Sequence, residues 1–192
     1  MKSLIRHILI VSVSCCLLPA SLVAGELVYN YADLAVEAFD INDRGYVGVE
    51  FNGSYKVHEK TFLMLGYSHA EASDVDGWLD SVTIGGGIMF QFQGNLDLVI
   101  DAGVIFREGG SGGHSSGNTG FALTERVRYL TVEDKVELSG GLVVESIMDN
   151  TELGVTLSVV YWATDKLGIK AGFRSVGYYE SMCLGVRYAL KH

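Results

Sequence analysis

The sequence predicts an all-β chain, an antiparallel up-and-down transmembrane β-barrel of ten strands, with eight strands as the alternative. Apolar and polar residues alternate at period two almost everywhere after residue 28, and helical spacing is nearly absent. The single proline, Pro19, precedes this region, so every later residue has a backbone N–H for a hydrogen-bond ladder. With 48% hydrophobic and 19% charged residues, the composition fits one folded domain and excludes a disordered chain.

Residues 1–25 are predicted to be a secretory signal peptide, which leaves residues 26–192 as the barrel domain. Lys2 and Arg6 precede an apolar run at 8–18, and small residues follow up to Ala24 and Gly25. The apolar run is shorter than the roughly 20 residues that a helix needs to cross a bilayer. Cys183 is the one cysteine after this segment. No disulfide is therefore expected in the exported chain.

The first five strands are predicted from alternating segments bounded by turn-forming residues. In the second of these segments, Val47, Val49 and Phe51 alternate with Gly48 and Glu50. The fourth and fifth segments show the same alternation over a longer stretch. These strands are expected at 29–40, 45–57, 60–71, 79–93 and 95–107.

The remaining five strands follow the same rule, and the last is the clearest. Met182, Leu184 and Val186 alternate there with Cys183 and Gly185, so one face is apolar and the other is small or polar. These strands are expected at 119–131, 135–148, 151–164, 166–176 and 179–190.

The connections predict how the barrel is oriented. Those at 57–59, 94, 132–134 and 164–165 are tight, whereas those at 72–78 and 108–118 are long and polar. Outer-membrane barrels have short periplasmic turns and longer external loops. The glycine- and serine-rich stretch 109–120 is therefore interpreted as a flexible external loop, and an even strand count returns both termini to the periplasm.

The aromatic residues are sorted by height along the predicted strands, as in the two aromatic girdles of a membrane barrel. Phe51 alone is expected near mid-strand. The end with tight turns is expected to carry Tyr29, Tyr31, Tyr55, Phe62, Phe90, Phe92, Tyr129, Tyr161, Trp162 and Tyr188. The end with loops is expected to carry Phe39, Tyr46, Tyr67, Trp78, Phe106, Phe121, Phe173, Tyr178 and Tyr179.

The C-terminal segment 183–190 resembles the assembly signal of small Gram-negative outer-membrane β-barrel proteins. The pattern is carried by Gly185, Tyr188 and Leu190, although Lys191 and His192 follow in place of a terminal aromatic residue. This resemblance implies residence in the outer membrane, contact with its lipids and lipopolysaccharide, and assembly by periplasmic chaperones and the barrel insertion machinery. The architecture serves many functions and selects none of them. The sequence leaves open whether the protein forms an oligomer.

The face opposite the apolar one is expected to line the lumen with balanced charge, which favours pairing across a narrow barrel over an ion-selective pore. The chain has 23 acids against 14 strong bases and no basic run, so nucleic-acid binding is excluded. The inward acids are expected to be Asp33, Glu37, Glu50, Asp97, Asp101, Glu137 and Glu145. The inward bases are expected to be Lys56, Arg107, Arg126, Arg128, Lys170, Arg174 and Arg187.

Within this set the sequence predicts a cluster around Arg126 and Arg128, on the strand at 119–131. Asp97, Asp101 and Glu137 are expected beside them, because antiparallel neighbours bring those heights together. Glu37 and Glu50 are expected to reach across the lumen towards the same guanidinium groups.

Glu125 is a misfit, because the alternation of its strand places it on the lipid face in mid-strand. A β-bulge near Thr124 would turn it inward, and a contact with another protomer would cover it. The sequence leaves both open.

Two further motifs are weak. The stretch 40–47 resembles the start of a calcium loop, but Arg44 stands at its fifth position, so a hairpin loop is preferred and no metal is expected. His69, Asp74 and Asp76 could form a hydrolase site at the rim, and a solvated loop is preferred.

The sequence therefore predicts a non-enzymatic outer-membrane barrel without a cofactor, whose lumen is closed or very narrow and whose loops face outward. The first alternative is a small channel for ions or polar solutes. The second is an outer-membrane hydrolase.

Overall fold

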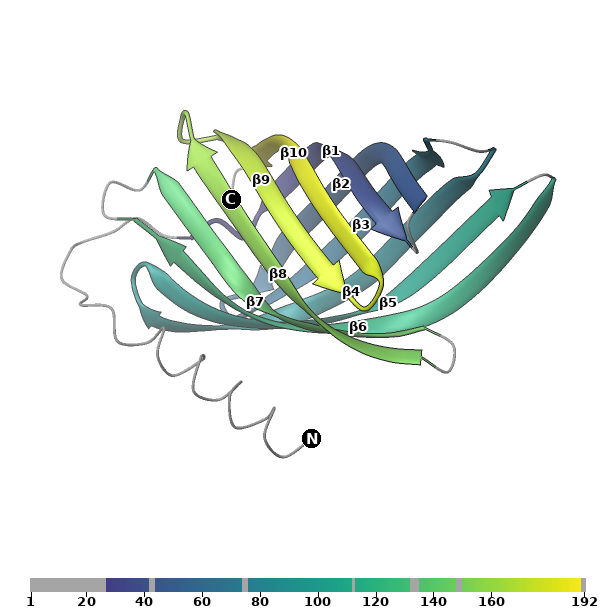
Figure 1. Ribbon diagram of the computed structural model, residues 1–192. Helices are drawn as coiled ribbons and strands as arrows, with labels where there is room; N and C mark the ends of the chain where they lie inside the picture. The colour runs from purple at the N-terminus through teal and green to yellow at the C-terminus, as the bar shows by residue number, and fades with distance from the viewer. Residues whose placement is uncertain are drawn as a thin grey trace.

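The computed structural model is a closed antiparallel barrel of ten strands (Figure 1). It describes residues 27–41, 44–73, 76–111, 113–131, 135–147 and 150–190. The expected signal peptide at 1–25 lies outside these residues. No helix in the described ranges is long and apolar enough to cross a membrane.

The strands follow one another around the barrel in chain order, so each pairs with its sequence neighbours. This confirms the predicted up-and-down topology with ten strands; the alternative of eight strands is wrong. The strands are β1 (Tyr31–Ile41), β2 (Arg44–His58), β3 (Thr61–Ala72), β4 (Trp78–Gln93), β5 (Leu96–Ser111), β6 (His114–Leu130), β7 (Val136–Ile147), β8 (Asn150–Trp162), β9 (Leu167–Val176) and β10 (Tyr179–Ala189).

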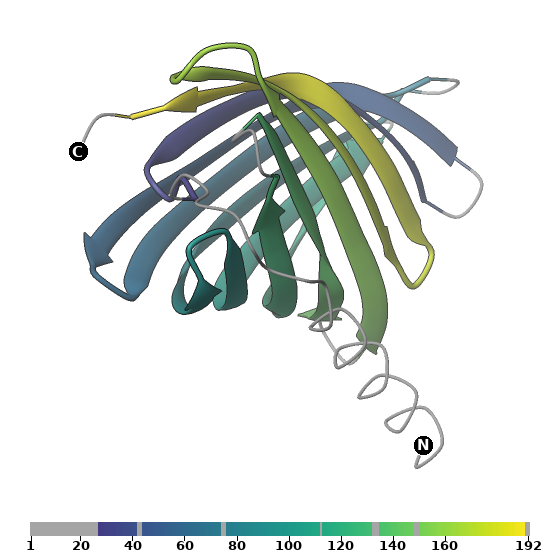
Figure 2. The ribbon, with the colours of Figure 1, turned by 90° about the vertical axis from the view of Figure 1, so that its left-hand side faces the viewer.

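The barrel closes where β1 pairs with β10 over the full length of both strands, from Tyr31 opposite Ala189 to Ile41 opposite Tyr179. The beginning of β1 and the end of β10 therefore lie at the same end, which we call the terminal end. Figure 2 looks at the molecule from this side. The opposite end carries the hairpin of β5 and β6, and we call it the hairpin end.

The predicted flexible loop at 109–120 is wrong. β5 and β6 continue to Ser111 and from His114, and Gly113 takes the turn with a φ of 84°. Their hairpin projects beyond the neighbouring strands (Figure 1). Backbone pairing orders this segment despite its glycine- and serine-rich composition. The predicted difference between tight and long connections is also weak, because most connections at both ends are short.

The exterior is apolar along most of its height, as a membrane-spanning barrel requires. On β1, Leu34 and Val36 are exposed while Asp33 and Glu37 are buried, and the same alternation runs through β10. The inward and outward assignments from the sequence thus agree with the structure on these strands.

Several aromatic residues assigned to the girdles point inward instead. They include Tyr29, Phe39, Phe62 and Trp162, each at most 8% exposed, and also Tyr31, Tyr46 and Tyr179. Strand position indicates the height of a residue but not its face where both faces are apolar, as around Phe62. The outward aromatic residues include Tyr55, Phe90, Phe92, Tyr161 and Tyr188 towards the terminal end, and Tyr67, Phe106 and Phe121 towards the hairpin end.

Glu125 faces outward, between Ile100 on β5 and Leu142 on β7. The register is regular through Thr124, so the bulge that would have turned Glu125 inward is absent from β6. Phe121 and Tyr129 flank it on the same face, one towards each end of the strand. Glu125 is therefore a carboxylate in the middle of the apolar exterior.

We expect Glu125→Leu to raise the free energy of unfolding by about 1–2 kcal/mol, because the leucine removes an acidic group from the hydrocarbon layer. Denaturant unfolding in lipid vesicles measures this change. Glu108→Leu is the matched control: Glu108 is also exposed, beyond Phe106 near the hairpin tip, and should give no comparable gain. Equal effects of the two substitutions would contradict the mid-membrane position of Glu125.

Candidate functional site: the lumen

The lumen has two parts of different character. Near the terminal end, side chains pack against one another and are almost fully buried; we call this the terminal cluster. Towards the hairpin end the lumen widens into a cavity of about 280 Å³, which we call the cup. Both are built from the inward positions of alternating strands.

The terminal cluster has an apolar portion to which the segment before β1 contributes. Leu27 and Tyr29 are each 4% exposed and pack with inward residues of several strands. The Tyr29 ring lies 5.6 Å from that of Phe62. The other buried members are Met89, Val99, Leu130, Val160, Trp162 and Ala189. Residues 27–30 thus fold into the barrel instead of extending away from it.

The polar portion of the terminal cluster is a chain of buried ion pairs. Arg187 forms a bidentate pair with Asp33, at 2.8 and 2.9 Å, and its third nitrogen lies 3.1 Å from Glu137 Oε1. Arg128 donates to the same Glu137 oxygen at 2.8 and 3.1 Å. The Lys170 amine lies 3.0 Å from Asp33. Such pairs stabilise a buried network only when all of their partners are present.

Arg128 joins the two portions. It donates to the backbone oxygen of Val28 at 2.9 Å, and its guanidinium lies 4.4 Å from the centre of the Tyr29 ring. The Tyr29 hydroxyl donates to Asp97 at 2.6 Å. The segment at 27–30 is therefore held by polar contacts as well as by apolar packing.

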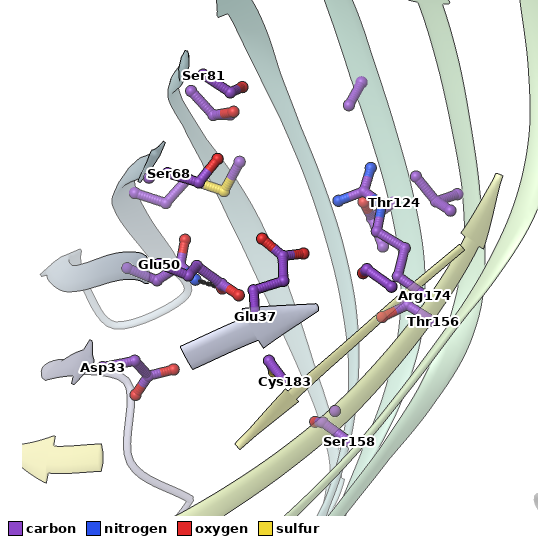
Figure 3. A pocket seen from close by; sticks show the side chains of 18 of the residues that line it. Asp33, Glu37, Glu50, Ser68, Ser81, Thr124, Thr156, Ser158, Arg174 and Cys183 are labelled. Atoms are coloured by element: carbon purple, nitrogen blue, oxygen red, sulfur yellow. Dashed lines mark hydrogen bonds between the residues drawn. The ribbon is translucent and has the colours of Figure 1, made fainter. Parts of the chain in front are cut away.

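The cup is lined by charge of both signs. Figure 3 shows Asp33, Glu37 and Glu50 on one side and Arg174 on the other, with Thr124 and Thr156 beside Arg174. The charged lining residues are Asp33, Glu37, Glu50, Asp101, Glu145, Arg107, Arg126, Lys170, Arg174 and Arg187. These are five acids and five bases, so the cup is formally neutral.

Near the hairpin end, ion pairs and aromatic rings line the wall of the cup. Arg174 lies 2.5 Å from Glu145, and Arg107 lies 3.9 Å from the other oxygen of that carboxylate. The Tyr179 hydroxyl donates to Glu37 at 2.7 Å. Phe39 packs between the rings of Tyr46 and Tyr179, with centroid distances of 5.0 and 5.2 Å.

The structure places the predicted cluster residues in two groups rather than one. Arg128 and Glu137 lie in the terminal cluster, whereas Arg126 pairs with Asp101 at 3.0 Å in the cup. Asp97 lies opposite Arg128 in the β5–β6 register but accepts its hydrogen bond from Tyr29.

The two glutamates expected to reach Arg126 and Arg128 have other partners. Glu37 bonds to Tyr179, and Glu50 accepts from the Asn52 amide and lies 3.6 Å from Lys170. The sequence reasoning missed Tyr29 and Tyr179 as lumen residues. Parity along β10 could have identified Tyr179, because it is an even number of residues from the inward Arg187.

The segment that resembles the assembly signal lies at the end of the chain, on β10 and the residue after it. Gly185 faces the backbone of β1 so closely that a Cβ there would stand 2.2 Å from the oxygen of Leu34. Tyr188 and Leu190 point outward and are 47% and 39% exposed.

The residues of the hydrolase-like and calcium-like motifs do not form those sites within the described residues. His69 lies 2.8 Å from Asp80, its cross-strand neighbour on the outer face of β4. Asp74 lies outside the described residues, and Asp76 lines an open pocket beside the β5–β6 hairpin. Asp40 is exposed near the end of β1, and Arg44 is the first residue of β2. The stretch that resembles a calcium loop is therefore part of the β1–β2 hairpin, of which residues 42–43 are not described.

The fold and the lumen together define the class of protein: a ten-stranded transmembrane β-barrel with a polar interior. No protein-family model matches the chain, and no curated protein matches it.

Similar solved structures are small barrels. Neisserial surface protein A is 17% identical, with 83% of this chain and 95% of that chain covered and a TM-score of 0.45. The KdgM porin in complex with disordered oligogalacturonate is 14% identical, with 84% and 99% covered and a TM-score of 0.48. The N-terminal barrel domain of Pseudomonas aeruginosa OprF is 14% identical, with 84% and 98% covered and a TM-score of 0.44. The likeness is one of fold.

Proposed function

We propose that the protein is a non-enzymatic outer-membrane barrel whose lumen is closed at the terminal end. The observation that carries this proposal is the terminal cluster, in which Arg128, Glu137 and Arg187 are buried together beneath the segment 27–30. A ten-stranded barrel is narrow enough for side chains to fill its interior. Ions crossing the membrane would have to break these pairs.

In this proposal the terminal end faces the periplasm and the hairpin end faces outward. Both ends of the barrel chain lie at the terminal end, which is the periplasmic arrangement in outer-membrane barrels. Cleavage near Ala24 or Gly25 would leave the buried segment 27–30 close to the start of the mature chain. The cup and the β5–β6 hairpin would then be the parts accessible from outside, and outer-membrane lipids and lipopolysaccharide would surround the exterior.

Planar-bilayer recording tests the closed lumen directly. The purified barrel, refolded and inserted from dilute solution, should show little steady conductance. A large, stable conductance in the unmodified protein would reject closure and support the alternative, a small channel. Separation of inner and outer membranes, followed by comparison of unheated and boiled samples by electrophoresis, tests the location and the folded barrel independently of conductance.

We expect Cys183 to resist bulky membrane-impermeant thiol reagents applied to intact cells. Its side chain lines the cup below Glu37 (Figure 3), where a large reagent does not fit beside the opposing wall. Ser115→Cys, in the exposed β5–β6 hairpin, serves as the positive control in a Cys183→Ser background. Labelling of Cys183 as fast as that of the hairpin cysteine would argue for a wide, open lumen.

A further inference from the structure

We propose that the cup is a binding site for a small zwitterion, a molecule that carries an ammonium group and a carboxylate a few bonds apart. This goes beyond closure of the lumen, since closure requires only the terminal cluster. The inference depends on how charge is divided within the cup: two sides of opposite sign face each other, and neither is fully neutralised by its own neighbours.

The basic side has three guanidinium groups and two carboxylates. Arg174 pairs with Glu145 at 2.5 Å, and Arg107 lies 3.9 Å from that same group. Arg126 lies 3.0 Å from Asp101 Oδ2, but no hydrogen bond to that oxygen forms within the described residues. The side chains of Arg107, Arg126 and Arg174 remain 24%, 25% and 36% exposed, so part of each guanidinium group faces the open cup. This side therefore has donors available for a further carboxylate, the group that guanidinium geometry fits best.

The acidic side has the opposite deficit. Within the described ranges, no lysine or arginine nitrogen lies within 4.0 Å of the Glu37 carboxylate, which accepts from the Tyr179 hydroxyl. Glu50 has Lys170 at 3.6 Å, but that amine lies closer, at 3.0 Å, to Asp33. An ammonium group in the cup would supply the missing positive charge.

A zwitterion suits the cup better than an ion of either sign. An anion at the arginines would be repelled by Glu37 and Glu50, and a cation at the glutamates would be repelled by Arg107 and Arg174. Because the lining is balanced overall, it attracts no net charge from solution. A molecule with both charges meets both sides at once.

Size and polarity limit the ligand further. The cavity of about 280 Å³ is slightly smaller than the usual small-molecule pockets, which begin near roughly 300 Å³. It therefore suits a ligand of amino-acid size. Thr124 and Thr156 line the cup beside Arg174 (Figure 3), where their hydroxyls can bond to a ligand carboxylate held by the arginines.

A homologous series measures the preferred separation of the two charges. The full barrel in lipid nanodiscs is titrated calorimetrically with glycine, 3-aminopropanoate, 4-aminobutanoate and 6-aminohexanoate. Propylammonium and propanoate represent the two halves. We expect one member of the series to bind at least about tenfold more tightly than either half, a difference of about 1.4 kcal/mol. The proposal is overturned if no zwitterion binds more tightly than propylammonium or propanoate, or if none binds at all.

Two substitutions then test which side of the cup binds the ammonium group and which binds the carboxylate. Glu37→Gln retains an acceptor for Tyr179 and should weaken the best zwitterion at least about tenfold while leaving propanoate binding unchanged or tighter. Arg174→Gln should weaken both the zwitterion and propanoate. Glu125→Gln, on the outer face, should change neither. Unchanged zwitterion affinity in Glu37→Gln contradicts the assignment, and because this variant removes only a charge, it stays informative if Arg174→Gln fails to fold.

Discussion

Arg128→Ala combined with Arg187→Ala is expected to lower the free energy of unfolding by about 3–5 kcal/mol and to open a cation-preferring leak. Both guanidinium groups bond to Glu137, and Arg187 also holds Asp33. Their loss leaves buried carboxylates without their partners, which draws water into the terminal cluster. It also releases Val28, whose backbone oxygen Arg128 binds. Urea unfolding in vesicles and single-channel recording measure the two effects.

Arg126→Ala is the matched control, because Arg126 stands on the same strand as Arg128 but, among the described residues, pairs with Asp101 in the cup. It should lose less stability and produce no steady leak. A wild-type barrel that already conducts, with a current unchanged by the Arg128 and Arg187 substitutions, would reject the closed lumen. A leak of equal size in Arg126→Ala would place the barrier in the cup instead.

Leu184→Arg should reduce the outer-membrane yield far more than Cys183→Arg. Leu184 is 64% exposed on the apolar exterior, whereas the adjacent Cys183 lines the cup. An arginine on the lipid face near the midplane costs about 2–4 kcal/mol, and this cost does not apply in the polar lumen. Quantification of folded, heat-modifiable barrel in isolated outer membranes measures the difference. Equal yields would contradict the assigned faces of β10.

The alternation of side chains was sufficient to predict the strand number and the face of most charged residues. Arg187 and Asp33 were assigned inward from parity alone, because the period of a strand is two whatever its partners are. Their pairing with Glu137 could not be predicted, since it depends on which inward side chains meet across the closed barrel. Contacts of this kind join residues far apart in the chain.

Two errors have local causes. Glycine and serine between Glu108 and Asn118 suggested a loop, but strand pairing there depends on backbone hydrogen bonds that small residues also make. Tyr29 was assigned to a girdle because aromatic residues at strand ends usually lie there. Tyr29 lies four residues before the inward Asp33 in the predicted strand at 29–40, so parity would have placed it in the lumen, where Asp97 accepts a hydrogen bond from its hydroxyl.

The pairing of β1 with β10 joins residues 154 positions apart at Asp33 and Arg187, so we expect it to form late in folding. At that moment the apolar pattern rejects a slip of one residue, which would turn Arg187 onto the lipid face. A slip of two residues keeps every side chain on its face, and hydrophobicity does not distinguish it from the native alignment. The bidentate bond between Arg187 and Asp33 distinguishes the two alignments, because the two residues stand directly opposite each other in the native register alone. We therefore expect this ion pair to favour the native stagger at which the barrel closes, and with it the tilt of the strands and the width of the interior.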